Sequence, residues 1–452
     1  MHSSAPQLAR QKQGDHVTAT ASRRRGFWLV DDLSPGSRWY RRSDGSHQYI
    51  IGNTQYSFLS GYKASGPQTE ADAQAGTAPL QPVAERGARR ESAPWPPRQR
   101  LAADVARNAQ YFKKLRFTLH PDRYPNPSEK PFLDAQGNLT DWGDYSHRPN
   151  PRWFNQRADA AVKAAFEHDL VADLILCGPD VEEARSTLRA RHNHGAPAPY
   201  LKYIARFGRI LRKFLPYDTT PISNHPNSKV LWTQAFDRTQ PWYDHHIIQR
   251  KIRELPVAAD VIKTVWSNPE GHGPRHKPTV NDELSYQGEG DRHIEGDTIE
   301  SHLGTFLGGG YGTTGWKYGN KLGHYFWGTF KPEEHTAADN LQWLRQTIDA
   351  NITFWKMAPD AGIFSNIDPG YRAMAWPGNE YVLGANKARQ GIVAQLPPGQ
   401  WTVKRFDVIA KQAATLSEGA SGRFTFDAPA SRAVLFHFKR NDRNLSSPGR
   451  TP

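Results

Sequence analysis

Apolar and polar positions follow two alternating periods along most of the chain. Short apolar runs at 49–54 and 117–122 end in polar residues, which is typical of barrel strands that present polar groups at their carboxyl ends. The run at 171–177 predicts a fully buried strand. Between such runs, the segment 101–115 spaces its apolar residues along one helical face. Strands that alternate with helices favour a parallel sheet, and this number of units favours a barrel.

The alternation continues to about residue 351. Helices are predicted at 153–170, 200–214, 257–266, 299–307 and 337–350, and further strands at 221–225 and 278–283. The predicted fold class is therefore α/β, with a (β/α)8 TIM-type barrel over residues 26–351.

Beyond residue 352 the pattern becomes all-β. The segments 401–406, 422–426 and 433–438 alternate apolar and polar residues, and turns such as the one at 397–399 separate them. This period of two predicts a small antiparallel β-sandwich over residues 352–440.

Three segments show neither period. Residues 1–25 are polar and basic, residues 64–100 are rich in Ala, Pro, Gln, Glu and Arg, and residues 441–452 form a short polar end. We interpret the two ends as disordered tails and residues 64–100 as a disordered insert in the barrel.

The formal net charge of +13 raises the question of nucleic-acid binding. Much of the excess lies in the segments without periodicity, and no nucleic-acid-binding motif accompanies it, so we expect a solvated basic surface and no nucleic-acid partner. Cys177 is the single cysteine. It lies in an apolar run, where a buried inert thiol is expected.

No apolar run reaches the length of a membrane span, and the first residues lack a secretory signal. We therefore expect a soluble, cytoplasmic protein without a membrane partner. Neighbouring histidines such as His245 and His246 point apart on one element, and no HExxH motif or cysteine cluster is present, so we expect no metal and no cofactor. The oligomeric state stays open.

The segment 277–286 is the most informative for chemistry. Asp282 and Glu283 follow the apolar start of a predicted strand, so Glu283 would point into the mouth of the barrel. In a retaining glycosidase such a glutamate is the nucleophile that attacks the anomeric carbon. A glutamate that caps the next helix or pairs with a nearby arginine would give the same pattern.

Several segments resemble the apiosidase-like glycoside hydrolases, which are barrel enzymes with a C-terminal β-sandwich of the collagen-binding-like type. They are HKPTVNDELSYQG, YIIGNTQYSFLSG, AADVARNAQYFKKLRFTLHPDRYPNP and ADLILCGPD, together with the closing segment from Gly399 to Phe438. The resemblance covers most of residues 26–440 and breaks at 64–100. It implies a retaining mechanism with Glu283 as the nucleophile and a carbohydrate substrate, such as polysaccharide side chains.

The same resemblance implies a general acid/base glutamate after an asparagine at the end of strand four, and the sequence lacks it. No apolar strand-like run lies between residues 194 and 215, so strand four itself is predicted to be missing. The literal pair Asn379-Glu380 falls in the predicted sandwich. Asp237 or Asp244 is a conceivable substitute acid, and we assign none.

Other residues are candidates for sugar binding. Aromatic residues make up 11% of the chain, including 14 Trp, and such rings either stack on sugars or fill a core. Polar side chains at strand ends either bind hydroxyls or cap loops. The candidates are His120, Asp122, Asn224, His225, Trp232, Trp242, Tyr286 and Trp316.

Two functions from different classes follow. The first is hydrolysis of O-glycosidic bonds, with activity in doubt because the acid/base is missing. The second is a catalytically silent relative that binds carbohydrate. A second carboxylate about 5–5.5 Å from Glu283 would favour the first. A general polyanion-binding protein, with steep salt dependence, is a third and weaker hypothesis.

Overall fold

The structure is a computed structural model, and it describes twelve segments of the chain. They are 28–55, 58–60, 98–118, 132–133, 136–140, 148–149, 157–175, 221–223, 242–267, 276–288, 293–316 and 330–441. The predicted tail 1–25, the helix predicted at 200–214 and Cys177 lie outside these segments.

Six parallel strands form one curled sheet in the order β8-β4-β3-β11-β10-β9. All six strands contain β-branched residues, and five of them are mostly buried, as expected for a parallel sheet that is covered by helices. Their bounds are β3 Ile51–Thr54, β4 Lys114–Thr118, β8 Val171–Ile175, β9 His246–Ile248, β10 Thr279–Gln287 and β11 Tyr311–Trp316.

Along the chain, β3 is the first strand of this sheet and β11 the last, and these two strands pair with each other. Strands that succeed one another along the chain then follow outward on both sides, which is the order of a barrel opened between two strands. The α/β prediction is confirmed to the extent of a curled six-stranded parallel sheet. Residues 221–223 are described and form no strand, so the strand predicted at 221–225 is not found in its described part.

In the described segments, five helices accompany the sheet: α3 Arg98–Tyr111, α5 Asp159–Glu167, α8 Leu255–Ser267, α9 Glu295–Leu307 and α10 Ala337–Asn351. Single 3-10 turns occur at η4 Pro35–Ser37, η5 Phe58–Ser60 and η8 Phe354–Lys356. Helix α3 begins at Arg98, so the insert predicted as disordered through residue 100 ends earlier than expected. Residues 98–100 are polar, so the apolar period that predicted the helix begins only at Leu101. Helix α5 ends at Glu167, three residues before the predicted end at 170, and residues 153–156 of the predicted helix lie outside the described segments.

The sequence did not predict two strands of the parallel sheet, β9 and β11. The described part of β9 is only three residues long, which is too short for a period to register. Strand β11 contains Thr313 and Thr314, both fully buried. Their hydroxyls donate to the Asp282 carboxylate and the Ser285 carbonyl oxygen on β10. Because these hydroxyls find partners inside the fold, the strand needs no apolar run.

Strands β12 to β20 are antiparallel and form two sheets. One has the order β12-β14-β15-β20-β17-β18 and the other β13-β16-β19. Side chains of both sheets share a core that includes Leu383, Ile392, Trp401, Phe426 and Phe436, so the sheets pack face to face as a β-sandwich. The bounds are β12 Ala358–Pro359, β13 Phe364–Ser365, β14 Arg372–Trp376, β15 Glu380–Ala385, β16 Arg389–Gln395, β17 Trp401–Asp407, β18 Gln412–Ala420, β19 Arg423–Ala428 and β20 Val434–Arg440.

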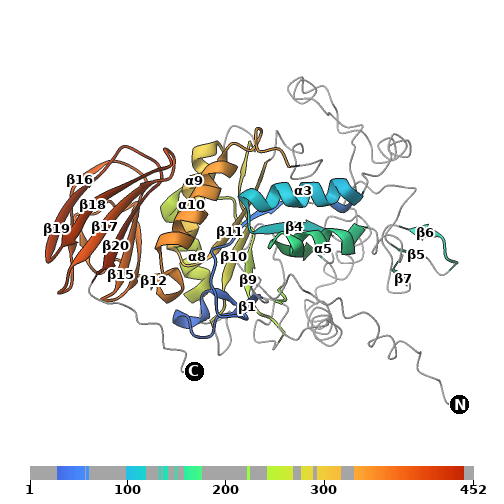
Figure 1. Cartoon of the computed structure of the whole chain (residues 1–452), viewed down its shortest axis with the longest axis horizontal. Helices are drawn as coiled ribbons and strands as arrows, with labels where there is room; N and C mark the ends of the chain where they lie inside the picture. The colour runs from blue at the N-terminus through green and yellow to red at the C-terminus, as the bar shows by residue number, and fades with distance from the viewer. Residues whose placement is uncertain are drawn as a thin grey trace, which may run out of the picture.

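Figure 1 shows helices α8, α9 and α10 between the parallel sheet and the antiparallel strands. A second core joins the two parts, because Leu307 of α9 and Leu341 of α10 pack in one cluster with Val382, Phe406 and Leu435 of the larger antiparallel sheet. The six-stranded antiparallel sheet therefore buries one face against helices and the other against its partner sheet.

Two small sheets complete the described structure. Strands β1 Trp28–Val30 and β2 Tyr40–Arg42 pair antiparallel, and β5 Phe132–Leu133 pairs with both β6 Leu139–Thr140 and β7 Arg148–Pro149. Among the described helices, none is long and apolar enough to cross a membrane.

Candidate active site

Strand β4 separates its side chains between two faces of the sheet. Leu115 and Phe117 are completely buried in a core with Val105 of α3 and Ala161 of α5. Because side chains alternate along a strand, Lys114 and Arg116 point to the opposite, inner face. They are 7% and 2% exposed. Two cations are therefore buried where barrels of this type usually place branched apolar residues.

Lys114 lies between two carboxylates from different strands. Its Nζ donates to Asp173 Oδ2 of β8 at 2.9 Å and also to Asp282 Oδ1 of β10. Burial alone would lower the pKa of the Lys114 ammonium, but the charges of Asp173 and Asp282 and their hydrogen bonds raise it above its ordinary value. Thr313 Oγ1 donates a further hydrogen bond of 2.9 Å to Asp282 Oδ1. Lys114 thus ties three strands together as a cation.

An irregularity in β10 brings two consecutive carboxylates to the inner face. Asn281 pairs with Gly312 and Ser285 pairs with Thr314, so four steps on β10 match two steps on β11. In a regular strand Asp282 and Glu283 would point to opposite faces. Here both contact cations of β4, because a bulge re-aims the side chains that it contains.

Asn281 fixes the start of this bulge. Its Nδ2 donates to the Arg250 carbonyl oxygen at 2.7 Å, and its Oδ1 accepts from the Arg250 backbone N–H at 3.1 Å. The same Oδ1 accepts from the Glu283 backbone N–H at 3.4 Å. This completely buried amide therefore links the Glu283 backbone N–H to the main chain of Arg250.

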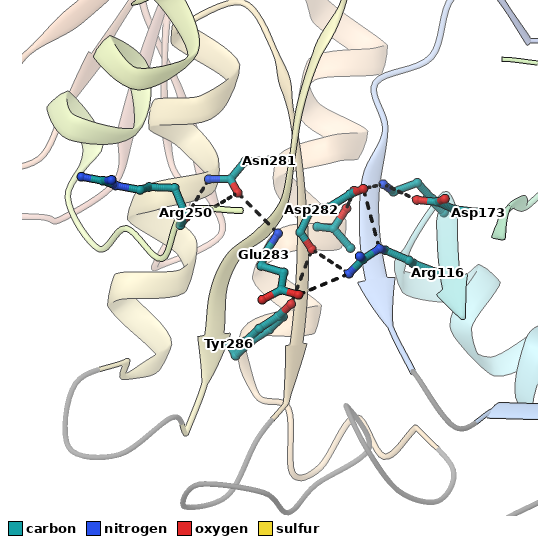
Figure 2. A network of polar contacts seen from close by, with 9 residues as sticks. Arg116, Asp173, Arg250, Asn281, Asp282, Glu283 and Tyr286 are labelled. Atoms are coloured by element: carbon teal, nitrogen blue, oxygen red, sulfur yellow. Dashed lines mark hydrogen bonds and ion pairs between the residues drawn. The ribbon is translucent and has the colours of Figure 1, made fainter. Parts of the chain in front are cut away.

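Glu283 is 3% exposed, and its Oε1 lies 3.7 Å from Arg116 Nη1. The same guanidinium places Nε 3.7 Å from Asp282 Oδ2 and donates to the Asp282 carbonyl oxygen at 3.5 Å. Figure 2 shows Arg116 of β4 reaching both acidic residues of β10, although β3 and β11 lie between these two strands in the sheet. With Lys114 and Asp173, the network contains two cations and three carboxylates. A carboxylate held this way has a fixed position and an electrostatic partner.

Tyr286 and the other sequence candidates occupy different surroundings. Tyr286 is completely buried, and its hydroxyl donates to the Asp282 carbonyl oxygen at 3.5 Å, which places it at this network (Figure 2). Trp242 is 3% exposed and packs against Tyr243 at 6.0 Å. Trp316 is partly exposed at the end of β11. The candidates His120, Asp122, Asn224, His225 and Trp232 lie outside the described residues.

Strand β10 does not end at Glu283, as the sequence pattern predicted. It continues to Gln287, and every residue of the strand is buried. The apolar run stops at Val280 because the buried side chains that follow are polar and bind one another. Glu283 therefore lies inside the strand, at its bulge, and not at its tip.

Of the carboxylates considered as acid/base groups, Glu380 and Asp244 are described. Glu380 begins β15, is 1% exposed and binds His437 Nε2 at 2.6 Å, so it is part of the sandwich, as expected. Asp244 accepts a hydrogen bond of 2.8 Å from the Ile222 backbone N–H. Asp237 and the expected place of strand four lie outside the described residues. Within the described segments, no group of three or more His, Cys, Asp or Glu side chains is arranged to hold a metal ion.

Sequence comparison finds no matching family model and no matching curated protein. Comparison of structures finds relatives of the fold. A solved structure described as a glycoside hydrolase aligns with 93% of this chain and 98% of its own, at 9% identity and a TM-score of 0.61. A glycoside hydrolase family 5 structure from Bacteroides vulgatus aligns with 93% of this chain and 94% of its own, at 10% identity and a TM-score of 0.59. The chain therefore has a glycoside-hydrolase fold.

Proposed function

We propose that this protein acts on O-glycosidic bonds of oligosaccharides or polysaccharides by a retaining mechanism, with Glu283 as the nucleophile. The observation that carries the proposal is the bulge of β10, which turns Glu283 toward Arg116 on the inner face of the sheet. The similarity to glycoside-hydrolase structures supports the choice of reaction class. We further propose that the chain is a distant relative of the apiosidase-like enzymes that its sequence resembles.

In this mechanism, a Glu283 oxygen attacks the anomeric carbon of the sugar while the bond to the leaving oxygen breaks. The product is a covalent glycosyl-enzyme, which a water molecule then hydrolyses with net retention of configuration. The Asn281 side chain accepts a hydrogen bond from the Glu283 backbone N–H and is itself held by two hydrogen bonds to the Arg250 main chain, while Arg116 restrains the Glu283 carboxylate. Such restraint favours a reactive alignment, because small displacements of a reacting group are costly.

The leaving group normally takes a proton from a second carboxylic acid. The sequence has no Asn-Glu pair where the family places one. We therefore propose that leaving groups of low basicity depart unaided, while natural glycosides react about 10²–10⁴-fold more slowly than in an enzyme with its acid.

A second candidate function is carbohydrate binding without turnover. The observation in its favour is the burial of Glu283, which is 3% exposed and engaged by Arg116. A carboxylate enclosed in this way is equally consistent with a purely structural role in the ion-pair network. The two functions differ in whether the carboxylate forms a bond to the sugar.

The test is covalent labelling with a panel of activated 2-fluoro-glycosides, followed by intact-mass measurement and peptide mapping. We expect one added glycosyl group on the peptide that contains Glu283 and none in the variant Glu283→Gln. Glu334→Gln is the control, since it removes a partly exposed glutamate that pairs with Lys331 outside the network. Labelling of the wild-type chain elsewhere, or equal labelling of Glu283→Gln, would reject Glu283 as nucleophile. A folded chain that binds oligosaccharides but takes up no label would favour the binding function.

A further inference from the structure

A groove of about 410 Å³ lies between helix α10 and strands β17 and β18. Its lining includes Trp343, Gln346 and Asn351 from the helix and Lys404, Phe406 and Thr415 from the strands. None of these residues belongs to the network around Glu283. The volume falls within the range of about 300–1,000 Å³ that is typical of small-molecule sites.

Aromatic side chains form one wall of this groove. Phe406 is 4% exposed, and its ring meets the half-buried indole of Trp343 at 6.3 Å and 66°. Phe406 therefore supports Trp343 from the core, and part of the indole remains open to the groove. A supported ring of this kind presents a flat apolar surface with little conformational freedom to lose.

The polar side of the groove is cationic. Lys404 Nζ donates to Asn351 Oδ1, and Lys439 Nζ donates to the Asn351 carbonyl oxygen, both at a long 3.4 Å. The residues that line the groove include no carboxylate, and within the described segments neither lysine forms an ion pair with Asp or Glu. A half-buried ammonium with only a long hydrogen bond to a neutral amide has capacity for an anionic partner.

We propose that this groove binds an acidic saccharide, with a hexuronate ring against Trp343 and its carboxylate on Lys404. The apolar face of a pyranose fits the indole, and the exposed side chains of Gln346 and Thr415 supply hydrogen bonds to hydroxyls. This site is additional to the one at Glu283. The choice of a sugar as ligand rests partly on the proposed function, whereas the charge of that sugar rests on the groove itself.

A carboxylate fits this groove better than a phosphate does. Helix α10 ends at Asn351, so the groove lies at the carboxyl end of the helix, where the partial charge of the helix dipole is negative. A singly charged carboxylate at Lys404 tolerates that field more easily than a phosphate dianion. No arginine, the residue best suited to bidentate phosphate binding, lines the groove.

Calorimetric titration of the full chain tests the proposal. The titrations use pentagalacturonate, cellopentaose as a neutral sugar of equal length, and inorganic triphosphate, at physiological salt and in the Glu283→Gln background so that no substrate is consumed. We expect pentagalacturonate to bind more tightly than cellopentaose. Lys404→Gln should weaken its binding by about tenfold or more, since a charge-assisted hydrogen bond is lost.

Lys387→Gln is the matched control, because Lys387 is an exposed lysine of the sandwich that pairs with Asp368 away from the groove. It should change the affinity by less than about twofold. Equal binding by Lys404→Gln and the parent chain, absence of any binding at millimolar sugar, or equal competition by triphosphate would each overturn the proposal. Labelling at Glu283 is measured separately, so failure there would leave the calorimetric result interpretable.

Discussion

The inner face of the parallel sheet contains a network of charged residues of opposite sign. Lys114 and Arg116 are held by Asp173, Asp282 and Glu283 from two other strands. Burying ions costs free energy of solvation, and only the mutual attraction and additional hydrogen bonds offset that cost. Removing one member of the network therefore has a larger effect than its own interactions suggest, because its partners stay buried without compensation.

We predict that Lys114→Met lowers the free energy of unfolding by about 3–5 kcal/mol, the range for breaking a buried ion pair. The substitution leaves Asp282, which is 1% exposed, without its ammonium partner. Urea denaturation followed by circular dichroism measures the change. The double variant Lys114→Met with Asp282→Asn should recover part of the loss.

Lys163→Met is the control for the loss of a lysine as such. Lys163 is 60% exposed and lies 3.9 Å from Glu167 on the surface of α5, so its removal should cost no more than about 1 kcal/mol. A Lys114→Met chain as stable as the Lys163→Met chain would show that the buried network contributes little to stability.

Among the elements, helices α8 and α9 approach each other through glycines. A Cβ at Gly304 would lie 2.2 Å from the Leu255 carbonyl oxygen, and one at Gly308 would lie 2.5 Å from the Ala259 carbonyl oxygen. Both obstacles are main-chain atoms of the facing helix. The two glycines, one turn apart, therefore allow a contact distance that no larger residue permits.

We predict that Gly304→Ala destabilises the protein by about 1–3 kcal/mol or more, as overpacking does, although alanine is intrinsically better than glycine in a helix by about 1 kcal/mol. Gly384→Ala in β15 should cost less. Its added Cβ would meet Leu307 Cδ1 at 2.1 Å, and that side-chain tip can rotate away. Thermal denaturation of both variants gives the comparison. A Gly304→Ala chain more stable than wild type would contradict the close helix contact.

The elements that the sequence predicts well are those whose apolar period is long. Helix α10 and strand β17 follow the predicted 337–350 and 401–406 within a residue or so. Strands β9 and β11 were missed because one is short in its described part and the other buries threonine hydroxyls that find partners only after folding. The local pattern of apolar and polar residues shows which face of an element is buried. It does not show which distant residue forms a hydrogen bond with a buried polar group.

The same reason limits prediction of the site. The Asp282-Glu283 pair could be found from the sequence because it follows an apolar strand start and resembles a known motif. Lys114 and Arg116 carry a signal too, since they alternate with Leu115 and Phe117 in a strand whose apolar residues face the helices. Their pairing with β10 is a contact between distant segments, and the bulge that permits it has no local signature.

For the molecule as a whole, buried histidines govern the response to acid. Burial lowers the pKa of His245 and His302 to about 4, and burial together with the charge of His302 lowers that of His335 to about 3. In the unfolded chain each titrates near about 6.5. Between pH 6.5 and 4 the unfolded chain therefore binds more protons than the folded one, so stability falls as the pH falls.

We predict that the midpoint of urea denaturation decreases steadily from pH 7 to pH 4.5. Each of these histidines adds up to about 1.4 kcal/mol per pH unit to the slope. His302→Gln should remove one such contribution and flatten the profile. His168→Gln is the control, because His168 is exposed at the end of α5. Parallel profiles for His302→Gln and His168→Gln would show that His302 takes up its proton in the folded state as readily as in the unfolded chain.

The pairing of β3 with β11 has a consequence for synthesis on the ribosome. The Tyr49 hydroxyl beside β3 binds the carbonyl oxygen of Gly310, 261 residues further along the chain. At about 5–20 residues per second, the nascent chain waits roughly 15–50 s before the partner of that edge emerges. Throughout this interval β3 presents unpaired backbone groups and an apolar flank, so the emerging amino-terminal half is the part of the protein that depends on chaperones.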